Sequence, residues 1–333
     1  MKSMRRIFLR RLATTAVTVA AAQLGAGGSV WAQGSYPDKP VRVILPFPPG
    51  GSLDLVMRLV ADKLGPRLGK PVVVENRPGA SGVVGTAAVA RAESDGYTLL
   101  FTPMSPLTTA AVLMKSLPYD ARKAFSPVSL VVAMPSVLVV NPKISARTVP
   151  DFISLAKASP NNLTYSSPGI GTTTHLASTL LSQVAEIKLT HVPYQGSGPA
   201  LNSVLAGHVD MMFMDTVNAL PRIRSKELIP IAVASPQRFH SLPDVPTFAE
   251  AGYPAVILDV WFAMFAPAGT PAAIRQKLRD EVAQVLAMPE VAARLRDLGV
   301  EIIGSQPDIL GEHLKNEYVR WAEVIRTTGM VPQ

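Results

Sequence analysis

The 333-residue chain has no cysteine, which excludes disulfide bonds, thiolate metal sites and a cysteine nucleophile. A chain of this length can bury enough apolar surface to fold without cross-links, and the absence of thiols suits an oxidising compartment. The five histidines show no metal-ligand spacing. Beyond the N-terminal segment, the best candidate for a membrane span, residues 128–140, is too short and contains Pro135. We therefore expect a soluble mature protein.

Sequence motifs for catalysis and nucleotide binding are also missing. There is no Gly-x-Ser-x-Gly elbow, no His-Glu-x-x-His motif and no Walker loop. Gly169-Ile170-Gly171 comes nearest to a dinucleotide turn, but Thr174 stands where the third glycine would be. His175 lies near a predicted helix start, where a structural role explains it better than a role as catalytic base. We expect neither catalysis nor a cofactor.

The N-terminal segment carries a concentrated positive charge. Five basic residues and no acidic residue lie within residues 1–32, where an alanine-rich apolar run ends in Val-Trp-Ala. This pattern predicts a signal peptide cleaved after Ala32 and a periplasmic protein, exported by the general or, given Arg5-Arg6, the twin-arginine route. A membrane anchor is the alternative, but several glycines weaken the apolar run. Cleavage leaves 301 residues and lowers the formal net charge from +8 to +3, so the charge does not indicate nucleic-acid binding.

A loop between a predicted strand and a predicted helix gives the first candidate binding site. Residues 41–45 are typical of a short buried strand, and apolar residues recur at helical spacing from residue 53 onwards. The loop between them reads Pro-Phe-Pro-Pro-Gly-Gly-Ser-Leu-Asp (46–54). A helix start has free backbone N–H groups, and the paired Gly50 and Gly51 let an anion approach them. The alternative is an ordinary turn with Ser52 as the N-cap.

A second loop of the same design lies more than a hundred residues later. The sequence Tyr-Ser-Ser-Pro-Gly-Ile-Gly-Thr-Thr-Thr-His-Leu (165–176) indicates a strand end, a glycine loop and a hydroxyl-rich helix start. Two such loops suggest two lobes that close on one small ligand. Asp215, at the end of a predicted strand, either contacts that ligand or caps the helix beginning at Thr216.

Strand-like and helix-like segments alternate through the mature chain, which predicts an α/β fold with largely parallel sheets flanked by helices. Within residues 126–140 we expect two β-rich runs separated by Met134-Pro135. This separation and residues 259–261 are the candidate crossings between lobes. The predicted organisation is a signal peptide (1–32), a first lobe made of residues 33–134 and 260–333, and a second lobe made of residues 135–259.

The mature chain resembles the Bug-type extracytoplasmic solute receptors, which are the periplasmic receptors of tripartite tricarboxylate transporters. The resemblance begins at Tyr-Pro-Asp-Lys-Pro (36–40) and includes both glycine loops described above. Its other segments are Val-Glu-Asn-Arg-Pro-Gly-Ala-Ser-Gly (74–82), Asp-Gly-Tyr-Thr-Leu-Leu (95–100), His-Val-Pro-Tyr-Gln-Gly-Ser-Gly-Pro-Ala-Leu (191–201), Leu-Pro-Asp-Val-Pro-Thr-Phe-Ala-Glu-Ala-Gly (242–252) and Ala-Pro-Ala-Gly-Thr-Pro (266–271). Two departures are Leu53, where a smaller or polar residue is common, and residues 104–106, which match no pattern of the family.

The resemblance implies a two-lobe, Venus-flytrap receptor similar to the type II periplasmic binding proteins. Such a receptor holds a small carboxylate, an amino acid or an aromatic acid and delivers it to the permease subunits of a tripartite tricarboxylate-type transporter in the membrane. We expect a monomer with no cofactor, no bound metal and no nucleic-acid partner. Two other functions remain open: a sensory receptor that presents its closed form to a signalling partner, and a periplasmic enzyme on the same lobes.

In the expected site, Phe47 packs on the ligand while Gly50, Gly51 and Ser52 bind its carboxylate through backbone and hydroxyl groups. The second loop closes from the other lobe, and Asp215 holds an ammonium or hydroxyl group on the far side. The candidate ligand-binding residues are Phe47, Gly50, Gly51, Ser52, Asp54, Ser105, Ser166, Ser167, Gly169, Gly171, Thr172, Thr173 and Asp215.

Overall fold

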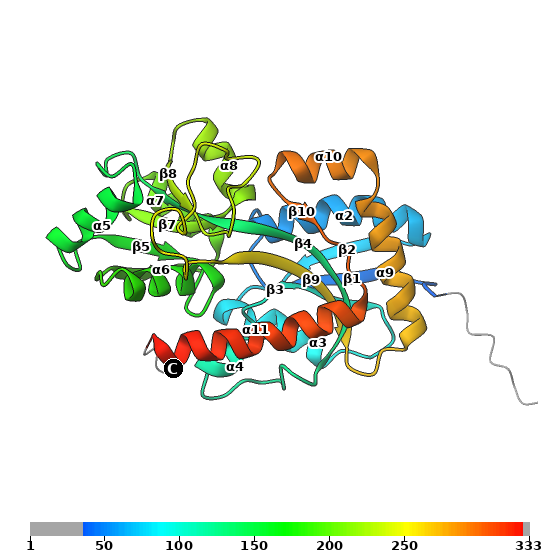
Figure 1. Ribbon diagram of the computed structural model, residues 1–333. Helices are drawn as coiled ribbons and strands as arrows, with labels where there is room; N and C mark the ends of the chain where they lie inside the picture. The colour runs from blue at the N-terminus through cyan, green and yellow to red at the C-terminus, as the bar shows by residue number, and fades with distance from the viewer. Residues whose placement is uncertain (1–35, 329–333) are drawn as a thin grey trace, which may run out of the picture. The chain divides into compact units, whose positions relative to one another are not determined.

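A ten-stranded sheet runs through the part of the chain that the computed structural model describes, residues 36–328 (Figure 1). The predicted signal peptide, residues 1–32, lies outside the described residues. Residues 39–333 make up one compact unit, and the account below concerns that unit. The strands are β1 (Val41–Leu45), β2 (Val72–Asn76), β3 (Thr98–Pro103), β4 (Phe125–Val140), β5 (Thr164–Ser167), β6 (Thr190–Pro193), β7 (Met211–Asp215), β8 (Ile229–Val233), β9 (Asp259–Pro267) and β10 (Glu301–Ile302).

Helices follow most of the strands. They are α2 (Ser52–Leu68), the 3-10 turn η1 (Ala80–Gly82), α3 (Val83–Ala90), α4 (Ala110–Leu113), α5 (Val149–Ala158), α6 (Thr173–Val184), α7 (Ser197–Leu205), α8 (Thr216–Arg224), α9 (Ala272–Leu286), α10 (Pro289–Asp297) and α11 (Pro307–Thr327). The predicted α/β fold with flanking helices is confirmed.

The strands follow the order β2-β1-β3-β9-β4-β7-β5-β6, and β8 and β10 also pair with β4. Strands β1, β2 and β3 pair in parallel at one end, and β5, β6 and β7 pair in parallel at the other. Between them, β4 and β9 run antiparallel to each other and to their neighbours. Figure 1 shows β4 and β9 side by side, joining the two parallel parts. The sheet is therefore parallel at both ends and antiparallel where the ends are connected.

Strand β4 is one continuous strand of 16 residues, whereas the sequence predicted two runs separated at Met134-Pro135. Its first part pairs with β9 as far as the pair Pro135–Asp259, and from Ser136 onwards it pairs with β7 and β8. Proline has no N–H for a ladder, so it fits the position where the partner strands change. We call β1, β2, β3, β9, β10 and residues 125–135 the first sheet region, and β5, β6, β7, β8 and residues 136–140 the second.

Local sequence signals explain how individual helices begin and end. Helix α5 starts with a complete capping box, because the Thr148 hydroxyl accepts from the Asp151 N–H and the Asp151 carboxylate accepts from the Thr148 N–H. Helix α2 ends at Gly69, whose φ of 70° is readily adopted by glycine. Its residues Val56 and Leu64 are fully buried, as the apolar spacing predicts.

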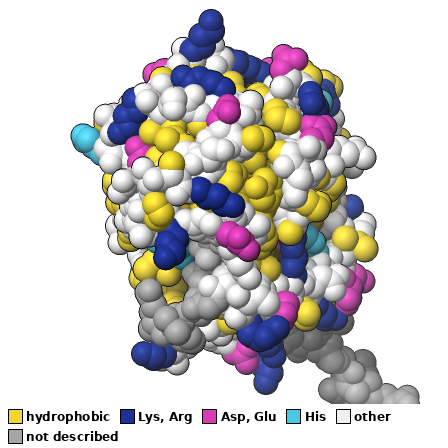
Figure 2. Space-filling model, turned by 60° about the vertical axis from the view of Figure 1, so that its left-hand side comes forward, with side chains coloured by type: hydrophobic (Ala, Val, Ile, Leu, Met, Phe, Trp, Pro, Cys, Tyr) yellow, Lys and Arg dark blue, Asp and Glu magenta, His cyan; other side chains and the backbone are white. Residues whose placement is uncertain are grey.

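The surface of the unit mixes charges of both signs. Basic, acidic and apolar side chains are interspersed over the face drawn in Figure 2. Exposed ion pairs such as Arg238–Glu250 and Arg326–Glu323 contribute to this pattern. Within residues 36–328, no helix combines the length and the apolar character that crossing a bilayer requires.

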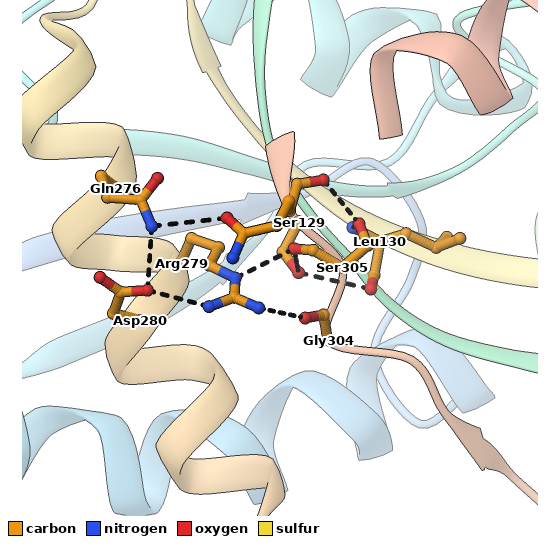
Figure 3. Close-up of polar contacts among 8 residues, drawn as sticks. Ser129, Leu130, Gln276, Arg279, Asp280, Gly304 and Ser305 are labelled. Atoms are coloured by element: carbon orange, nitrogen blue, oxygen red, sulfur yellow. Dashed lines mark hydrogen bonds and ion pairs between the residues drawn. The ribbon is translucent and has the colours of Figure 1, made fainter. Parts of the chain in front are cut away.

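A polar cluster fastens the chain between β10 and α11 to the first sheet region (Figure 3). Arg279 on α9 donates to the carbonyl oxygens of Gly304 (3.1 Å) and Ser305 (3.3 Å). Ser129 donates to the Ser305 carbonyl at 2.9 Å, and the Ser305 hydroxyl accepts from the Leu130 N–H at 3.0 Å. These bonds fix the point from which α11 departs.

Helix α11 connects the two sheet regions from outside the sheet. The Glu317 carboxylate accepts from the indole N–H groups of Trp321 (2.8 Å) and of Trp261 on β9 (3.4 Å). At its other end, the Thr327 carbonyl accepts from Gln183 on α6 at 3.2 Å. The helix is thus tied to β9 of the first region and to a helix of the second.

Candidate functional site

A cavity of about 60 Å³ lies between the two sheet regions, and we call it the central cavity. Residues at or after the ends of β1, β3, β5, β6 and β7 form most of its wall, and β9 supplies the rest. A site beyond the carboxyl ends of parallel strands is the usual ligand position in open α/β sheets. The lining residues are Phe47, Pro48, Gly51, Ser52, Leu53, Pro103, Ser105, Pro168, Thr172, Thr173, Thr174, Ser197, Asp215, Val260 and Phe262.

Three helices begin at the central cavity without a side-chain cap from any described residue. Their first residues, Ser52 of α2, Thr173 of α6 and Ser197 of α7, all line it. The N-cap of α6, Thr172, uses its hydroxyl to donate to the Gly169 carbonyl instead, at 2.7 Å. Because the first N–H groups of a helix have no intrahelical acceptor and lie at the positive end of its dipole, this wall favours an anion.

The hydroxyl of Thr174 is a second sign that a ligand belongs here. Thr174 lines the central cavity and is only 8% exposed, yet its Oγ1 atom has no hydrogen-bond partner among the described residues. A buried polar atom without a partner costs about 1–3 kcal/mol. A polar group bound in the cavity would satisfy this hydroxyl and recover part of that free energy.

Asp215 is the one charged side chain among the described residues that line the central cavity. Its carboxylate accepts from the Asn218 N–H at 3.0 Å, and so it caps α8, as one of the two predictions had it. It also accepts from the Ser52 hydroxyl at 2.6 Å, across the boundary between the sheet regions. Burial raises the pKa of Asp215 above its ordinary value, against the opposing effect of the hydrogen bonds from Ser52 and Asn218.

The rest of the central cavity is apolar. Phe47, Leu53, Val260 and Phe262 contribute side chains to its wall together with three prolines. Phe262 is held by edge-to-face contact with Phe101, at a centroid distance of 6.0 Å. The cavity therefore combines hydrogen-bond donors on one part of its wall with apolar carbon on the other.

The structure brings seven of the thirteen candidate residues together around the central cavity. They are Phe47, Gly51, Ser52, Ser105, Thr172, Thr173 and Asp215. The other six lie outside its wall, and they are Gly50, Asp54, Ser166, Ser167, Gly169 and Gly171.

Gly50 and Asp54 lie outside the wall of the central cavity and stabilise the first loop by a hydrogen bond to each other. Gly50 has a φ of 85°, and its N–H donates to the Asp54 carboxylate at 3.1 Å. Arg58, one helical turn further on, donates to the same carboxylate at 2.9 Å. Burial acts to raise the pKa of Asp54, but the hydrogen bonds from Arg58 and Gly50 outweigh it and lower the pKa below its ordinary value. The carboxylate is thereby committed to the loop itself.

Ser166 and Ser167 support the second loop in a similar way. The Ser166 hydroxyl donates to the Ala200 carbonyl at 3.1 Å. The Ser167 hydroxyl lies 2.7 Å from Nε2 of His191 and accepts from the Gly169 N–H at 3.2 Å. These contacts hold the loop in shape.

Two stacked histidines stand behind the same loop. His175 accepts from the Gly171 N–H at 3.0 Å through Nδ1, and its ring lies 4.1 Å from that of His191. Burial, with a smaller effect from His191, lowers the pKa of His175 to about 3, and burial lowers that of His191 to about 4. Both rings are therefore neutral near pH 7, and His175 has the structural role that the sequence suggested.

Sequence reasoning missed several residues of the wall. Thr174 continues the hydroxyl run Thr172-Thr173, and Ser197 follows a glycine N-cap, so both had a detectable signal. Val260 and Phe262 had none, because they reach the cavity only through the pairing of β9 with β3 and β4. No cluster of three or more acidic or histidine side chains that could hold a metal ion occurs in the described range.

The family model described as "Tripartite tricarboxylate transporter family receptor" matches residues 56–330. The chain belongs to this receptor family. Protein BugT of Bordetella pertussis (strain Tohama I) is 37% identical over 321 residues, which cover 96% of this chain and 98% of BugT. The resemblance to Bug-type receptors is thereby confirmed.

Two solved structures extend the family match to the fold. The periplasmic binding protein BugD is 34% identical and superposes with a TM-score of 0.85, covering 90% of this chain and 100% of that one. An R. palustris protein solved with adipate is 32% identical, with a TM-score of 0.87 and the same coverage of both chains. The chain therefore shares its architecture with a solved periplasmic binding protein and with a protein solved with adipate.

Proposed function

We propose that the chain is a periplasmic solute-binding receptor that captures a small organic carboxylate and delivers it to a tripartite tricarboxylate-type membrane transporter. The observation that carries this proposal is the meeting of three uncapped helix starts, those of α2, α6 and α7, at one cavity. The unpartnered hydroxyl of Thr174 in the same wall supports it. Membership of the receptor family and the adipate complex of a relative support the ligand class.

The ligand's carboxylate is held by neutral donors. Backbone N–H groups at the starts of α2 and α6 and the hydroxyls of Thr173 and Thr174 surround the space it occupies, while the Ser52 hydroxyl already donates to Asp215. Each hydrogen bond to a charged group contributes about 1.5–3 kcal/mol. Asp215 offers an acceptor to a ligand that carries a hydroxyl or ammonium group. Several such bonds without a lysine or arginine allow firm binding and still permit release.

We infer that the two sheet regions act as lobes, residues 33–134 with 260–333 and residues 135–259, which close around the ligand. Hinge motion is expected where β4 and β9 pass between the regions, near Pro135 and Asp259. Contacts across the boundary support this: Thr109 donates to the Gly171 carbonyl at 2.6 Å, and Ser52 donates to Asp215. These bonds form only in a closed arrangement, so they help to hold the ligand once the lobes meet.

Export follows from the predicted signal peptide, and the receptor acts as a monomer that a permease recognises in its closed form. On the face in Figure 2, charges of both signs alternate, and no continuous basic stripe is visible there for a nucleic acid to follow. The ligand leaves the receptor chemically unchanged, because the one hydroxyl–carboxylate pair among the described wall residues, Ser52 with Asp215, joins the two sheet regions while Asp215 also caps α8, and no histidine lines the wall.

Thermal unfolding and calorimetry of the protein from residue 33 onwards test this function. The panel comprises mono-, di- and tricarboxylates and amino acids, with neutral sugars as the control class. A ligand at a hundred times its Kd stabilises the fold by about 2.7 kcal/mol, which raises the Tm by roughly 5 °C or more. We expect 1:1 binding of a carboxylate that mass spectrometry recovers unchanged. Binding of sugars alone, or turnover of the acid, would contradict the proposal.

A further inference from the structure

A second cavity, of about 400 Å³, lies beside the central one, and we call it the side cavity. Its wall has two sides. Residues on one side lie beside the first sheet region and are residues 80–81, Ser105, Thr109, Ala110, Leu113 and Met114, and those on the other lie beside the second and are residues 169–171 and 193–195. Ser105 lines both cavities. The second loop does the same, with Pro168 and residues 172–174 on the central cavity and residues 169–171 on the side cavity. The two spaces are therefore neighbours within one cleft.

Close approach of the two sheet regions forms the side cavity. A Cβ atom at Gly169 would lie 2.5 Å from the Ser81 hydroxyl, and one at Gly171 would lie 2.9 Å from Cδ1 of Leu113. Both glycines have positive φ values, 145° and 74°. Only glycine allows the second loop to approach Ser81 and Leu113 this closely. Gly169 and Gly171 therefore help to form the side cavity, although they lie outside the wall of the central cavity.

The side cavity differs from the central one in its chemistry. None of the described residues lining it is charged. The N–H groups of Gly169, Gly171 and Tyr194 already donate to Ser167 Oγ, His175 Nδ1 and the Ser167 carbonyl. Carbon atoms of Leu113, Met114 and Ile170 form much of the remaining wall. The Thr109 hydroxyl already donates to the Gly171 carbonyl, which leaves the hydroxyls of Ser81, Ser105 and Tyr194 and the Gln195 amide as polar side-chain groups. These neutral groups do not replace the helix starts of the central cavity, so a carboxylate moved there would lose water for weaker donors, whereas an uncharged, partly apolar group fits.

The central cavity has room for a small end of a ligand, and the side cavity has room for a larger end. A single water molecule needs about 10–15 Å³ of such free space, so 60 Å³ holds a carboxylate and a few more atoms. The side cavity has room for a ring or a branched chain. Tyr194 and Gln195 at its edge offer neutral hydrogen bonds to a hydroxyl or carbonyl on that larger end.

We propose that the ligand is an elongated monocarboxylic acid, with its carboxylate in the central cavity and an uncharged, partly apolar end in the side cavity. This inference rests on the proposed function and narrows its ligand class. Desolvation disfavours a second carboxylate at the far end. Ile170, 36% exposed at the wall of the side cavity, then becomes a specificity-determining residue.

Calorimetry with three acids of related length tests the inference: propionate, 3-phenylpropionate and adipate. Burial of the phenyl ring should make 3-phenylpropionate bind at least tenfold more tightly than either of the others. Ile170→Trp fills the side cavity and should weaken 3-phenylpropionate at least tenfold while leaving propionate within twofold. Ile303→Trp is the matched control, because Ile303 is similarly exposed, at 42%, and lines neither cavity.

Each outcome decides between the two proposals. Adipate or propionate binding as tightly as 3-phenylpropionate would overturn the division into a charged and an uncharged end, and carboxylate binding itself would stand. Equal effects of Ile170→Trp on the phenyl acid and on propionate would also overturn it. If none of the three acids, nor any other carboxylate, binds the unmodified receptor, the proposed function fails and this inference fails with it.

Discussion

Helix α5 and the helices around the central cavity begin in opposite ways. On the surface, α5 has a complete capping box made by Thr148 and Asp151. At the cavity, α2, α6 and α7 begin without any side-chain cap, although Ser52 and Thr172 are residues that often provide one. The N-caps of α2 and α7 are Gly51 and Gly196, and a glycine in place of a side-chain cap costs a few tenths of a kcal/mol. Helices α9, α10 and α11 also begin without a side-chain cap, but their first residues lie outside the wall of the central cavity. What distinguishes α2, α6 and α7 among the described helices is that their free N–H groups lie where a ligand can use them.

Helix α8 lies between these two cases. It begins at the central cavity, like α2 and α6, yet Asp215 caps it, as Asp151 does for α5. Its free N–H groups are thus partly used by the protein, and the cavity gains a carboxyl group whose pKa burial raises. The comparison thus distinguishes the uncapped starts of α2, α6 and α7, which are open to an anion, from the start of α8, where Asp215 places a carboxyl group in the cavity. The predictions below test this distinction.

The largest effect is expected from Gly51→Val at the uncapped start of α2. A Cβ at Gly51 would lie 3.8 Å from that of Ser197 on the opposite wall, so the valine methyl groups occupy the central cavity. Gly51 has a φ of −83°, which valine can adopt, and the positive φ belongs to Gly50. The variant should fold and lose at least two hydrogen bonds to the ligand, which weakens binding roughly a hundredfold or more.

Circular dichroism and calorimetry measure these two properties separately. Gly198→Val is the control, because a Cβ there meets no atom within 4 Å and Gly198 lies outside the wall of the central cavity. It should keep the ligand affinity of the wild type. A folded Gly51→Val protein with undiminished affinity would mean that the loop is only a turn.

Thr174→Val should change stability and affinity in opposite directions. Removing an unpartnered buried hydroxyl leaves the ligand-free protein at least as stable, with a gain of up to about 1 kcal/mol. The same change removes a hydrogen bond to the ligand, which lowers affinity about tenfold or more. Urea denaturation without ligand and calorimetry with ligand give the two values. A loss of stability with unchanged affinity would show that the hydroxyl serves the fold.

Thr148→Ala is the counterpart on the surface helix α5. It removes the capping box and should lower the free energy of unfolding by about 1 kcal/mol. Ligand affinity should stay at the wild-type value, because Thr148 lies in neither cavity wall. Denaturation and calorimetry on the same preparation measure both. Equal effects on stability and binding would erase the contrast between the two kinds of helix start.

The smallest effect is a pH dependence at Asp215. Because its pKa is raised in the folded state, the stability it contributes is present below the ordinary aspartate range and is lost as the pH rises through the raised pKa. Asp215→Asn keeps a good N-cap and lacks this titration. In the absence of ligand, the variant should therefore gain stability relative to the wild type as the pH rises above the ordinary aspartate range.

Asp54→Asn should show the reverse. The pKa of Asp54 is lowered in the folded state, so its contribution is present above the ordinary range and is lost as the pH falls. This variant should be more destabilised at pH 7 than at pH 3. Urea denaturation at several pH values measures both slopes, and slopes of the same sign in the two variants would contradict the assignment.

Much of this site was visible in the sequence because its signals are local. Glycine pairs, hydroxyl residues and the strand–loop–helix order identified Gly51, Ser52 and Thr172, and the i,i+4 spacing of Asp54 and Arg58 could have shown that this acid was already paired. Ser166 and Ser167 belong to β5 itself, and their hydroxyls bond to the Ala200 carbonyl and to His191 and Gly169, which their position beside the loop did not reveal.

Other features depend on contacts between distant parts of the chain. Pro135 predicted a break between two strands, but β4 continues through it. The strand pairs with β9 as far as Pro135 and with β7 from Ser136 onwards. Val260 and Phe262 reach the central cavity through the same pairing. No local pattern specifies which strands become neighbours. The proposal that one cavity takes the carboxylate and the other takes the uncharged end could therefore be made only from the folded chain.

The Glu317 carboxylate accepts hydrogen bonds from two indole groups, and these two tryptophans provide an intrinsic fluorescence signal. The chain has three tryptophans, and removal of residues 1–32 leaves only Trp261 and Trp321. Both donate to the same carboxylate, and the two residues flanking Trp261 on β9, Val260 and Phe262, line the central cavity. All intrinsic tryptophan fluorescence of the protein from residue 33 onwards therefore originates at one junction, next to two residues of the central cavity wall. Emission from that junction can follow ligand capture in unlabelled protein, on the timescale of mixing.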